Sequence, residues 1–139
     1  MVISEQPMEA DVEAGYAAFV PSIAVNKDGV VAVSWYDRRG LPQSQRVPLE
    51  VTTGPYAGMN VTHRVTDGWN VRLRVSLDGG ATWLPSVQLN EQPSRGEVEI
   101  GHTAGLAAAA DGRFHATWID SRTGTKQLWS AAIEVTREK

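Results

Sequence analysis

Two stretches of this sequence repeat one another and decide its fold class. Residues 23–39 read Ile-Ala-Val-Asn-Lys-Asp-Gly-Val-Val-Ala-Val-Ser-Trp-Tyr-Asp-Arg-Arg, and residues 106–122 read Leu-Ala-Ala-Ala-Ala-Asp-Gly-Arg-Phe-His-Ala-Thr-Trp-Ile-Asp-Ser-Arg. An Asp-Gly pair, a Trp, an Asp and an Arg recur in both at one constant offset of 83 (111 minus 28). Upstream, Glu5-Gln6-Pro7 recurs as Glu91-Gln92-Pro93. Chance seldom produces so many identities in order, so we infer a protein of two repeat units.

Each unit has the residue pattern of short β-strands. An apolar run leads into the Asp-Gly pair, a turn signal because both residues tolerate positive φ. The run that follows is rich in β-branched and aromatic residues, as strands are. No apolar stretch keeps a helical period over ~12 residues, so we expect an all-β fold. The predicted strands are residues 22–26, 30–36, 70–77 and 86–90 in the first unit, 106–110, 113–119 and 127–135 in the second, and 2–4 ahead of both.

A long insertion separates the second and third predicted strands of the first unit. Residues 41–69 contain Pro42, Pro48, Gly54-Pro55 and Asp67-Gly68, which favour loop structure. The equivalent link in the second unit covers only residues 121–126. Long loops in compact domains are commonly functional or disordered. We therefore interpret the insertion as an addition to the repeat framework.

The composition is that of one ordinary globular domain. The 139 residues are 42% hydrophobic, and the net charge of -3 argues against nonspecific nucleic-acid binding. The chain has no cysteine, which excludes disulfides, thiolate zinc ligands and cysteine nucleophiles. No apolar run reaches the ~18 residues of a membrane-spanning helix, and the first residues show no signal peptide. We expect no membrane partner and leave the compartment open.

Residues 76–83 carry a second informative pattern. They read Ser-Leu-Asp-Gly-Gly-Ala-Thr-Trp, which fits Ser-x-Asp-x-Gly-x-Thr-Trp and resembles the Asp-box, the bacterial neuraminidase repeat of sialidase-like β-propellers. In such a turn an Asp carboxylate accepts backbone N–H groups, and the Trp is expected to anchor the turn in the apolar layer. We assign these residues a structural role: Ser76, Asp78, Gly80, Thr82 and Trp83.

The resemblance covers most of the chain and implies about two four-stranded blades of a six-bladed, sialidase-like β-propeller. Residues 1–16 would be an outer strand and linker, 17–90 a first blade with the insertion at 41–69, and 91–139 a second blade with three strands. Propeller blades bury their faces against neighbouring blades, and a closed ring needs four to eight of them. We therefore expect that one chain, residues 1–139, forms a single partial domain that cannot close the ring.

Two kinds of partner could complete such a ring. One is self-association as a homo-oligomer, in which a trimer of two-blade chains would close by exchange of the strand at residues 2–4. The other is the set of missing blades in a longer parent chain. The resemblance also suggests a secreted or periplasmic parent.

The propeller architecture predicts a ligand face. Links after the second and fourth strands open onto one side, which the resemblance implies is opposite the Asp-box. The planar fork of arginine suits carboxylates and sugar hydroxyls, so a carbohydrate is the expected ligand class. An alternative interpretation makes the Asp-x-Arg pairs, 37 with 39 and 120 with 122, framework ion pairs, because both units have one. The candidate ligand-face residues are Asp37, Arg38, Arg39, Tyr56, His102, Asp120 and Arg122.

Three functions remain open. The first is a non-catalytic sialidase-like module that binds a glycan or another ligand. The second is a subunit or fragment of an exo-sialidase-type glycoside hydrolase, although residues 19–22, Phe-Val-Pro-Ser, lack the arginine of the family's Arg-Ile-Pro element. The third is a propeller scaffold for protein association. The three histidines, His63, His102 and His115, have no partner at metal-ligand spacing, so we expect no metal and no cofactor.

Overall fold

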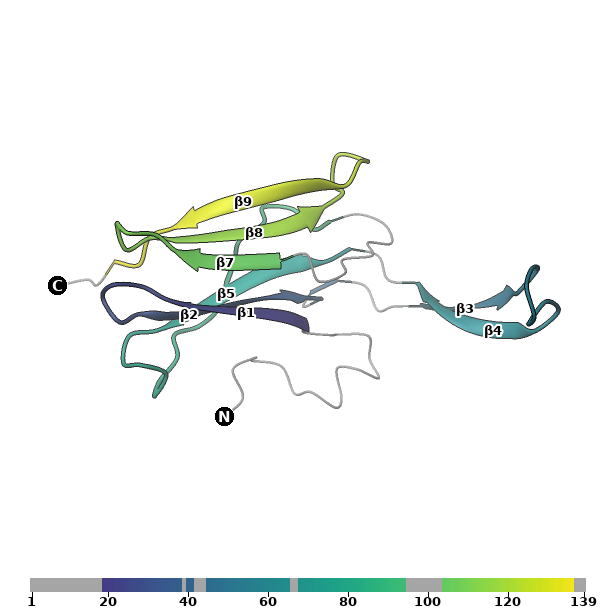
Figure 1. Cartoon of the computed structure of the whole chain (residues 1–139), viewed down its shortest axis with the longest axis horizontal. Helices are drawn as coiled ribbons and strands as arrows, with labels where there is room; N and C mark the ends of the chain where they lie inside the picture. The colour runs from purple at the N-terminus through teal and green to yellow at the C-terminus, as the bar shows by residue number, and fades with distance from the viewer. Residues whose placement is uncertain (1–18, 39, 42–44, 66–67, 95–103, 137–139) are drawn as a thin grey trace.

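The structure is a computed structural model that describes residues 19–38, 40–41, 45–65, 68–94 and 104–136. Within these ranges all regular structure is β-strand, arranged as antiparallel sheets of four and three strands and a separate two-stranded hairpin (Figure 1). The predicted all-β class is confirmed. Nothing in the described ranges is a helix long and apolar enough to cross a membrane. The predicted strand at residues 2–4 lies outside the described residues.

The first sheet has the strand order β1-β2-β5-β6, and the second has the order β7-β8-β9. Six of the seven predicted strands in these sheets match the structure within about three residues at each end, whereas the fourth strand of the first unit is reduced to two residues. A β-bulge interrupts the pairing of β1 with β2 near Val20, whose φ is 53°. The strands are β1 Phe19–Val25, β2 Val31–Asp37, β5 Asn70–Ser76, β6 Val87–Gln88, β7 Ala104–Ala108, β8 Phe114–Asp120 and β9 Gln127–Ile133.

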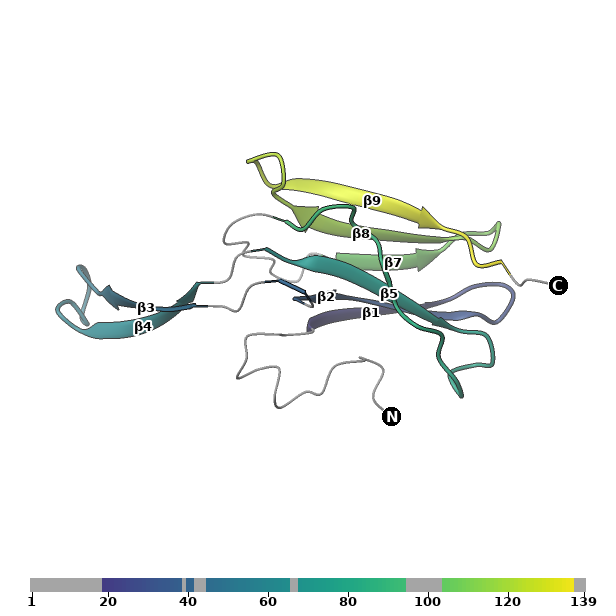
Figure 2. The same ribbon diagram turned by 180° about the vertical axis from the view of Figure 1, so that it is seen from behind.

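The two sheets stack in the same orientation. Strands β1 and β7 run in the same direction, as do β2 and β8, and β5 and β9 (Figures 1 and 2). At one end, the Asn26 side-chain amide donates to the Gly112 carbonyl oxygen at 2.7 Å and joins the β1–β2 turn to the β7–β8 turn. The second repeat is therefore placed on the first without being turned over.

Side chains alternate along a strand, so each sheet has two faces. Equivalent residues of the two repeats identify which face of one sheet corresponds to which face of the other. The front face carries Trp35 in the first sheet and the equivalent Trp118 in the second. The back face carries Tyr36 in the first sheet and Ile119 in the second. The back face of the first sheet packs against the front face of the second, since Tyr36 and Val71 cluster with Trp118. Packing is thus front to back.

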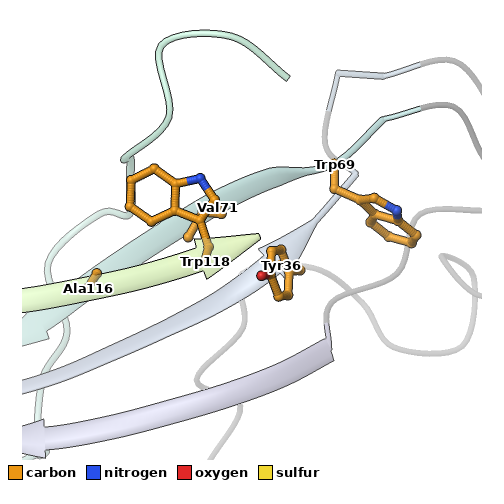
Figure 3. Close-up of a cluster of buried hydrophobic side chains, with 5 residues drawn as sticks. All are labelled: Tyr36, Trp69, Val71, Ala116 and Trp118. Atoms are coloured by element: carbon orange, nitrogen blue, oxygen red, sulfur yellow. The ribbon is translucent and has the colours of Figure 1, made fainter. Parts of the chain in front are cut away.

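The core lies between the sheets as two adjoining clusters. One joins Tyr36, Trp69 and Val71 to Ala116 and Trp118 (Figure 3). Figure 3 shows Trp118 beside Val71, with Trp69 near the end of the sheets. The other cluster consists of Val30, Ala32, Leu73, Val75 and the fully buried Phe114. Each large apolar side chain buried in this way contributes about 1.5–3 kcal/mol to stability. Burial in this layer is therefore the main contribution that holds the two repeats together.

The insertion is not the loop that its prolines and glycines favour. It contains an antiparallel hairpin of β3 Gln45–Glu50 and β4 Asn60–Val65, which projects from one end of the sheets (Figure 1). Pro48 lies inside β3 opposite Thr62. A proline is tolerated there because both strands of a two-stranded sheet are edges, where a missing N–H need not break the ladder. Trp69, the last residue of the predicted insertion, belongs to the core.

Candidate functional site

The end of the sheets from which the hairpin projects holds several of the candidate ligand-face residues. The last residues of β2 and β8 lie at this end, as does the start of β5 (Figures 1 and 2). We call it the loop-bearing end. Arg39 and His102 are candidates that lie outside the described residues.

Asp37 and Arg38 are built into the framework of the loop-bearing end. Both residues are fully buried. An Asp37 carboxylate oxygen accepts the indole N–H of Trp35 at 3.2 Å. The Arg38 guanidinium donates to the carbonyl oxygen of Gly68 and lies 5.1 Å from the centroid of the Trp69 ring. Arg38 therefore ties the end of β2 to the segment that leads into β5.

Asp120 and Arg122 form an ion pair at the equivalent place in the second repeat. The Arg122 Nε donates to Asp120 at 2.8 Å, the Arg122 backbone N–H donates to the other carboxylate oxygen at 2.7 Å, and a second guanidinium nitrogen also contacts the carboxylate. The Arg122 guanidinium lies 4.2 Å from the centroid of the Trp129 ring. The side chains are 12% and 1% exposed, so the pair is nearly desolvated. The ion pair that the framework interpretation predicts is thus present in the second unit.

The Tyr36 hydroxyl connects the two sheets at this end. Its oxygen accepts the backbone N–H of Ile119 at 3.0 Å. Burial raises the pKa of the Tyr36 phenol above its ordinary value; the Ile119 N–H opposes this, and the negative charge of Asp120 adds to it. A phenol in these surroundings stays protonated at neutral pH, which is unfavourable for a tyrosine nucleophile.

Asn90, which is not among the predicted site residues, organises the connection after β6. Its side-chain oxygen accepts the Val71 N–H at 2.7 Å, and its amide donates to the Gln92 carbonyl oxygen at 2.7 Å. Just after Gln92, the backbone N–H of Ser94 donates to the Trp69 carbonyl oxygen at 2.9 Å. The signal in the sequence was its place directly before the repeated Glu-Gln-Pro, where the second unit begins.

Tyr56 is the one described candidate that solvent reaches freely. It lies in the connection between β3 and β4, residues 51–59, and 67% of it is exposed. The turn is held by the Gly58 N–H, which donates to the Val51 carbonyl oxygen at 2.7 Å. Met59 and Val61 are also exposed. The hairpin thus presents an aromatic ring and apolar side chains beyond the loop-bearing end.

The Ser76–Trp83 turn lies at the opposite end of the first sheet (Figure 1). Asp78 accepts the Thr82 hydroxyl at 2.6 Å, the Thr82 N–H at 2.8 Å and the Ser76 hydroxyl at 2.7 Å. The Ser76 oxygen in turn accepts the Gly80 N–H at 2.7 Å. These bonds, those of Thr82 first, hold the pKa of the Asp78 carboxyl well below its usual range. The predicted role of Asp78 as an acceptor across the turn is confirmed.

Trp83 does not anchor this turn in the apolar layer as predicted. It is half-buried and belongs to neither core cluster. Its ring lies 5.8 Å from the guanidinium of Arg74, which donates to the carbonyl oxygens of Leu84 at 3.0 Å and Trp83 at 3.2 Å. The reason is that an arginine occupies this part of the front face and stacks on the indole. Trp83 therefore covers the outside of β5.

A shallow cavity of about 250 Å³ lies between the β1–β2 and β7–β8 turns, away from the loop-bearing end. Asp28, Asp111 and Glu134 contribute carboxylates to its lining. Asp111 pairs with Arg113 at its rim, which lowers the pKa of the Asp111 carboxyl and raises that of the Arg113 guanidinium. Across the described residues, no three His, Asp or Glu side chains are grouped so that they could hold a metal ion.

No protein-family model, no curated protein and no solved structure gives a significant match to this chain.

Proposed function

We propose that the chain is a sialidase-like, Asp-box β-propeller segment of two consecutive blades, and that it binds a glycan or a similar ligand without catalysing a reaction. The observation that carries this proposal is the front-to-back packing of two sheets with equivalent sequences, the relation that neighbouring blades of a propeller have. The hydrogen bonds of Asp78 in the Ser76–Trp83 turn support the Asp-box assignment.

The loop-bearing end is the proposed binding surface. It carries the projecting hairpin with exposed Tyr56, and aromatic rings with a polar edge are common contacts for sugars and peptides. It is also the end opposite the Ser76–Trp83 turn. Arg38 and the Asp120–Arg122 pair are committed to contacts within the chain, so we assign them to the support of this surface.

A catalytic role is not favoured by the groups described at this end. Asp37 is buried and accepts the Trp35 indole N–H, Asp120 is paired with Arg122, and the phenol of Tyr36 has a raised pKa. We expect no release of fluorophore from a fluorogenic sialoside by the isolated chain. Hydrolysis above the buffer rate, abolished by Asp120→Asn, would instead favour the glycoside hydrolase alternative.

Binding is tested on a glycan array with the native chain, Tyr56→Ala and Leu84→Ala. Leu84 is an exposed apolar residue near the Ser76–Trp83 turn and is the matched control. We expect Tyr56→Ala to weaken glycan binding at least tenfold while Leu84→Ala leaves it unchanged. Equal binding by all three proteins would remove the hairpin from the site, and no binding by the native chain would contradict a glycan ligand.

A role as an association scaffold has its own supporting observation. On the edge strand β1, Ile23 and Val25 point to the same face of the first sheet and are 65% and 57% exposed, and exposed apolar side chains on an edge strand favour association.

A further inference from the structure

The second sheet has a strand edge to which, within the described residues, no strand is added. In the first sheet, β5 pairs with β2 on one side and with β6 on the other. In the second sheet, β9 holds the place of β5, and in the described part of the chain it pairs with β8 alone. The N–H and C=O groups along such an edge are a template for another strand. The outer edge of β9 is therefore a place where a fourth strand can add.

The outward hydrogen bonds of β5 show which groups this edge offers. The Leu89 N–H donates to the Val71 carbonyl oxygen at 2.8 Å, and the Val71 N–H donates to the Asn90 side chain at 2.7 Å. The Leu84 N–H donates to the Val75 carbonyl oxygen at 2.9 Å. Alternate residues of a strand bond to the same side. By register, the outward-bonding residues of β9 are Leu128, Ser130 and Ala132.

The sequence contains a second segment with the features of β6 and its continuation. Residues 87–93 read Val-Gln-Leu-Asn-Glu-Gln-Pro, and residues 1–7 read Met-Val-Ile-Ser-Glu-Gln-Pro. At this offset of 86, Ile3 corresponds to Leu89 and Ser4 corresponds to Asn90. The apolar residue is kept, and so is a side-chain oxygen that can accept an N–H. Residues 1–4 lie outside the described residues, and their sequence is that of a strand that adds to β5 or to its equivalent.

From this correspondence we infer that residues 1–4 of a second copy of the chain add to the outer edge of β9 as its fourth strand. The pairing repeats that of β5 with β6. Val2 lies opposite Trp129, as Gln88 lies opposite Arg72. The Ile3 N–H donates to the Leu128 carbonyl oxygen. Exchange of one element between copies is a common route to association, because the pairing already exists within the chain.

The connection from β6 to β7 indicates why the donor is another copy. Residues 89–103 lead from the edge of the first sheet to the second sheet, which is stacked on the back face of the first. The same relation places residues 1–4, which precede β1, on a sheet in front of the first sheet. The chain's own second sheet is behind it, so the β9 that receives these residues belongs to another molecule.

This association takes place at a strand edge and does not require the front face of the first sheet to be bare. Val33 and Trp35 on that face are each only 4% exposed within one chain. Residues 5–18 separate the donated segment from β1, and an extended chain of that length spans up to about 45–50 Å. The two copies can therefore be linked through the strand without burying a second pair of sheet faces.

Disulfide trapping tests the pairing directly, because the chain has no cysteine of its own. Full-length Ile3→Cys and Leu128→Cys proteins are mixed under oxidised glutathione, since paired positions of neighbouring strands are close enough for a disulfide. We expect a reducible dimer at a yield at least tenfold above that of Ile3→Cys mixed with Leu84→Cys. Leu84 is exposed near the Ser76–Trp83 turn and is the matched control.

A proline in β9 tests the acceptor edge without a new cysteine. Ser130→Pro removes an N–H that faces outward, which an edge strand tolerates, whereas Ser130→Ala keeps that N–H and is the control. Masses are measured by light scattering over a wide range of concentration, with circular dichroism to verify folding. We expect the native chain and Ser130→Ala to associate as concentration rises and Ser130→Pro to remain a monomer.

Three outcomes would overturn the inference. A trapping yield no higher than that of the Leu84→Cys control would show that residues 1–4 do not reach β9. A cross-linked monomer from the double variant Ile3→Cys, Leu128→Cys would show that the segment folds back on its own chain. Association of a folded Ser130→Pro protein equal to that of the native chain would place the contact elsewhere. Glycan binding is measured separately, so its presence in a monomer would retain the proposed function while this inference fails.

Discussion

The hydroxyl oxygen of Tyr36 in β2 accepts the backbone N–H of Ile119 in β8 at 3.0 Å. The two residues occupy equivalent positions in their repeats, since 119 minus 36 is 83. A side chain of one repeat therefore bonds the backbone of the next at its own counterpart. In the second sheet that position holds an isoleucine, which has no hydroxyl to offer. The bond is thus specific to the contact between these two sheets, and its removal tests that contact.

Tyr36→Phe should destabilise the chain while it preserves the packing of the ring. The change leaves the Ile119 N–H without its acceptor in a part-buried place, which costs about 1–3 kcal/mol. Equilibrium unfolding in urea measures the loss. Tyr56→Phe removes an exposed hydroxyl and should leave the midpoint unchanged. Equal midpoints for native and Tyr36→Phe proteins would show that the bond does not hold the sheets together.

The second repeat contains a buried and an exposed ion pair of the same Asp-x-Arg spacing, Asp120 with Arg122 and Asp111 with Arg113, which provide a matched comparison. Arg122→Ala leaves the buried Asp120 carboxylate unpaired and removes the stacking on Trp129, so we expect a loss of about 3–5 kcal/mol. Arg113→Ala breaks the same kind of pair with Asp111 at the surface, where both side chains are about half exposed. Its effect on the urea midpoint should be small, since exposed ion pairs contribute little. Similar losses in the two variants would contradict the role of burial.

Because the pKa of the Asp78 carboxyl is lowered in the folded chain, we expect the fold to lose stability in acid. Its folded pKa lies below the unfolded value of about 3.9, so its carboxylate stabilises the fold above that pH, and the contribution is lost as pH falls through the folded pKa. Between about pH 4 and pH 2, the urea midpoint of the native chain should fall more steeply than that of Asp78→Asn. Parallel pH profiles of the two proteins would show that the turn does not depend on the charged carboxylate.

Gly68→Ala should be far more damaging than Gly29→Ala. Both glycines have positive φ, 82° and 75°, so an alanine costs about 1–2 kcal/mol in backbone strain at either place. At Gly68 the new Cβ would also lie 2.5 Å from the Ser94 carbonyl oxygen, whereas nothing lies within 4 Å at Gly29. The Gly68 carbonyl is moreover the acceptor for buried Arg38. Thermal unfolding compares the two, and equal melting temperatures would contradict this packing.

The sequence predicts the framework well because the framework repeats. The Asp-Gly turns, the β-branched runs and the recurring Trp indicate the main strands, and the Ser76–Trp83 pattern predicts the hydrogen bonds of Asp78. The ion pair of Asp120 with Arg122 also follows from local spacing alone. Each of these features depends on residues within a few positions of one another or on comparison between the units.

Features that depend on distant partners could not be predicted in the same way. Arg38 corresponds to Ser121 in the second unit, so the repeat gives no sign that it is buried, and its acceptor at Gly68 lies 30 residues along the chain. The hairpin was missed because Pro48 and Gly54 favour loops, although strand edges tolerate proline. The position of the Trp83 ring depends on its contact with the Arg74 guanidinium, which is a tertiary contact.

The place where the hairpin leaves the sheet has an evolutionary consequence. Asp37 and Asn70, the residues on either side of it, face each other as a strand pair, and in the second sheet Asp120 faces Gln127 across a six-residue link. The framework thus accepts a short connection or a long one at the same point without a change of register. Appendages of different length and chemistry can be exchanged at this junction while the scaffold beneath them stays the same.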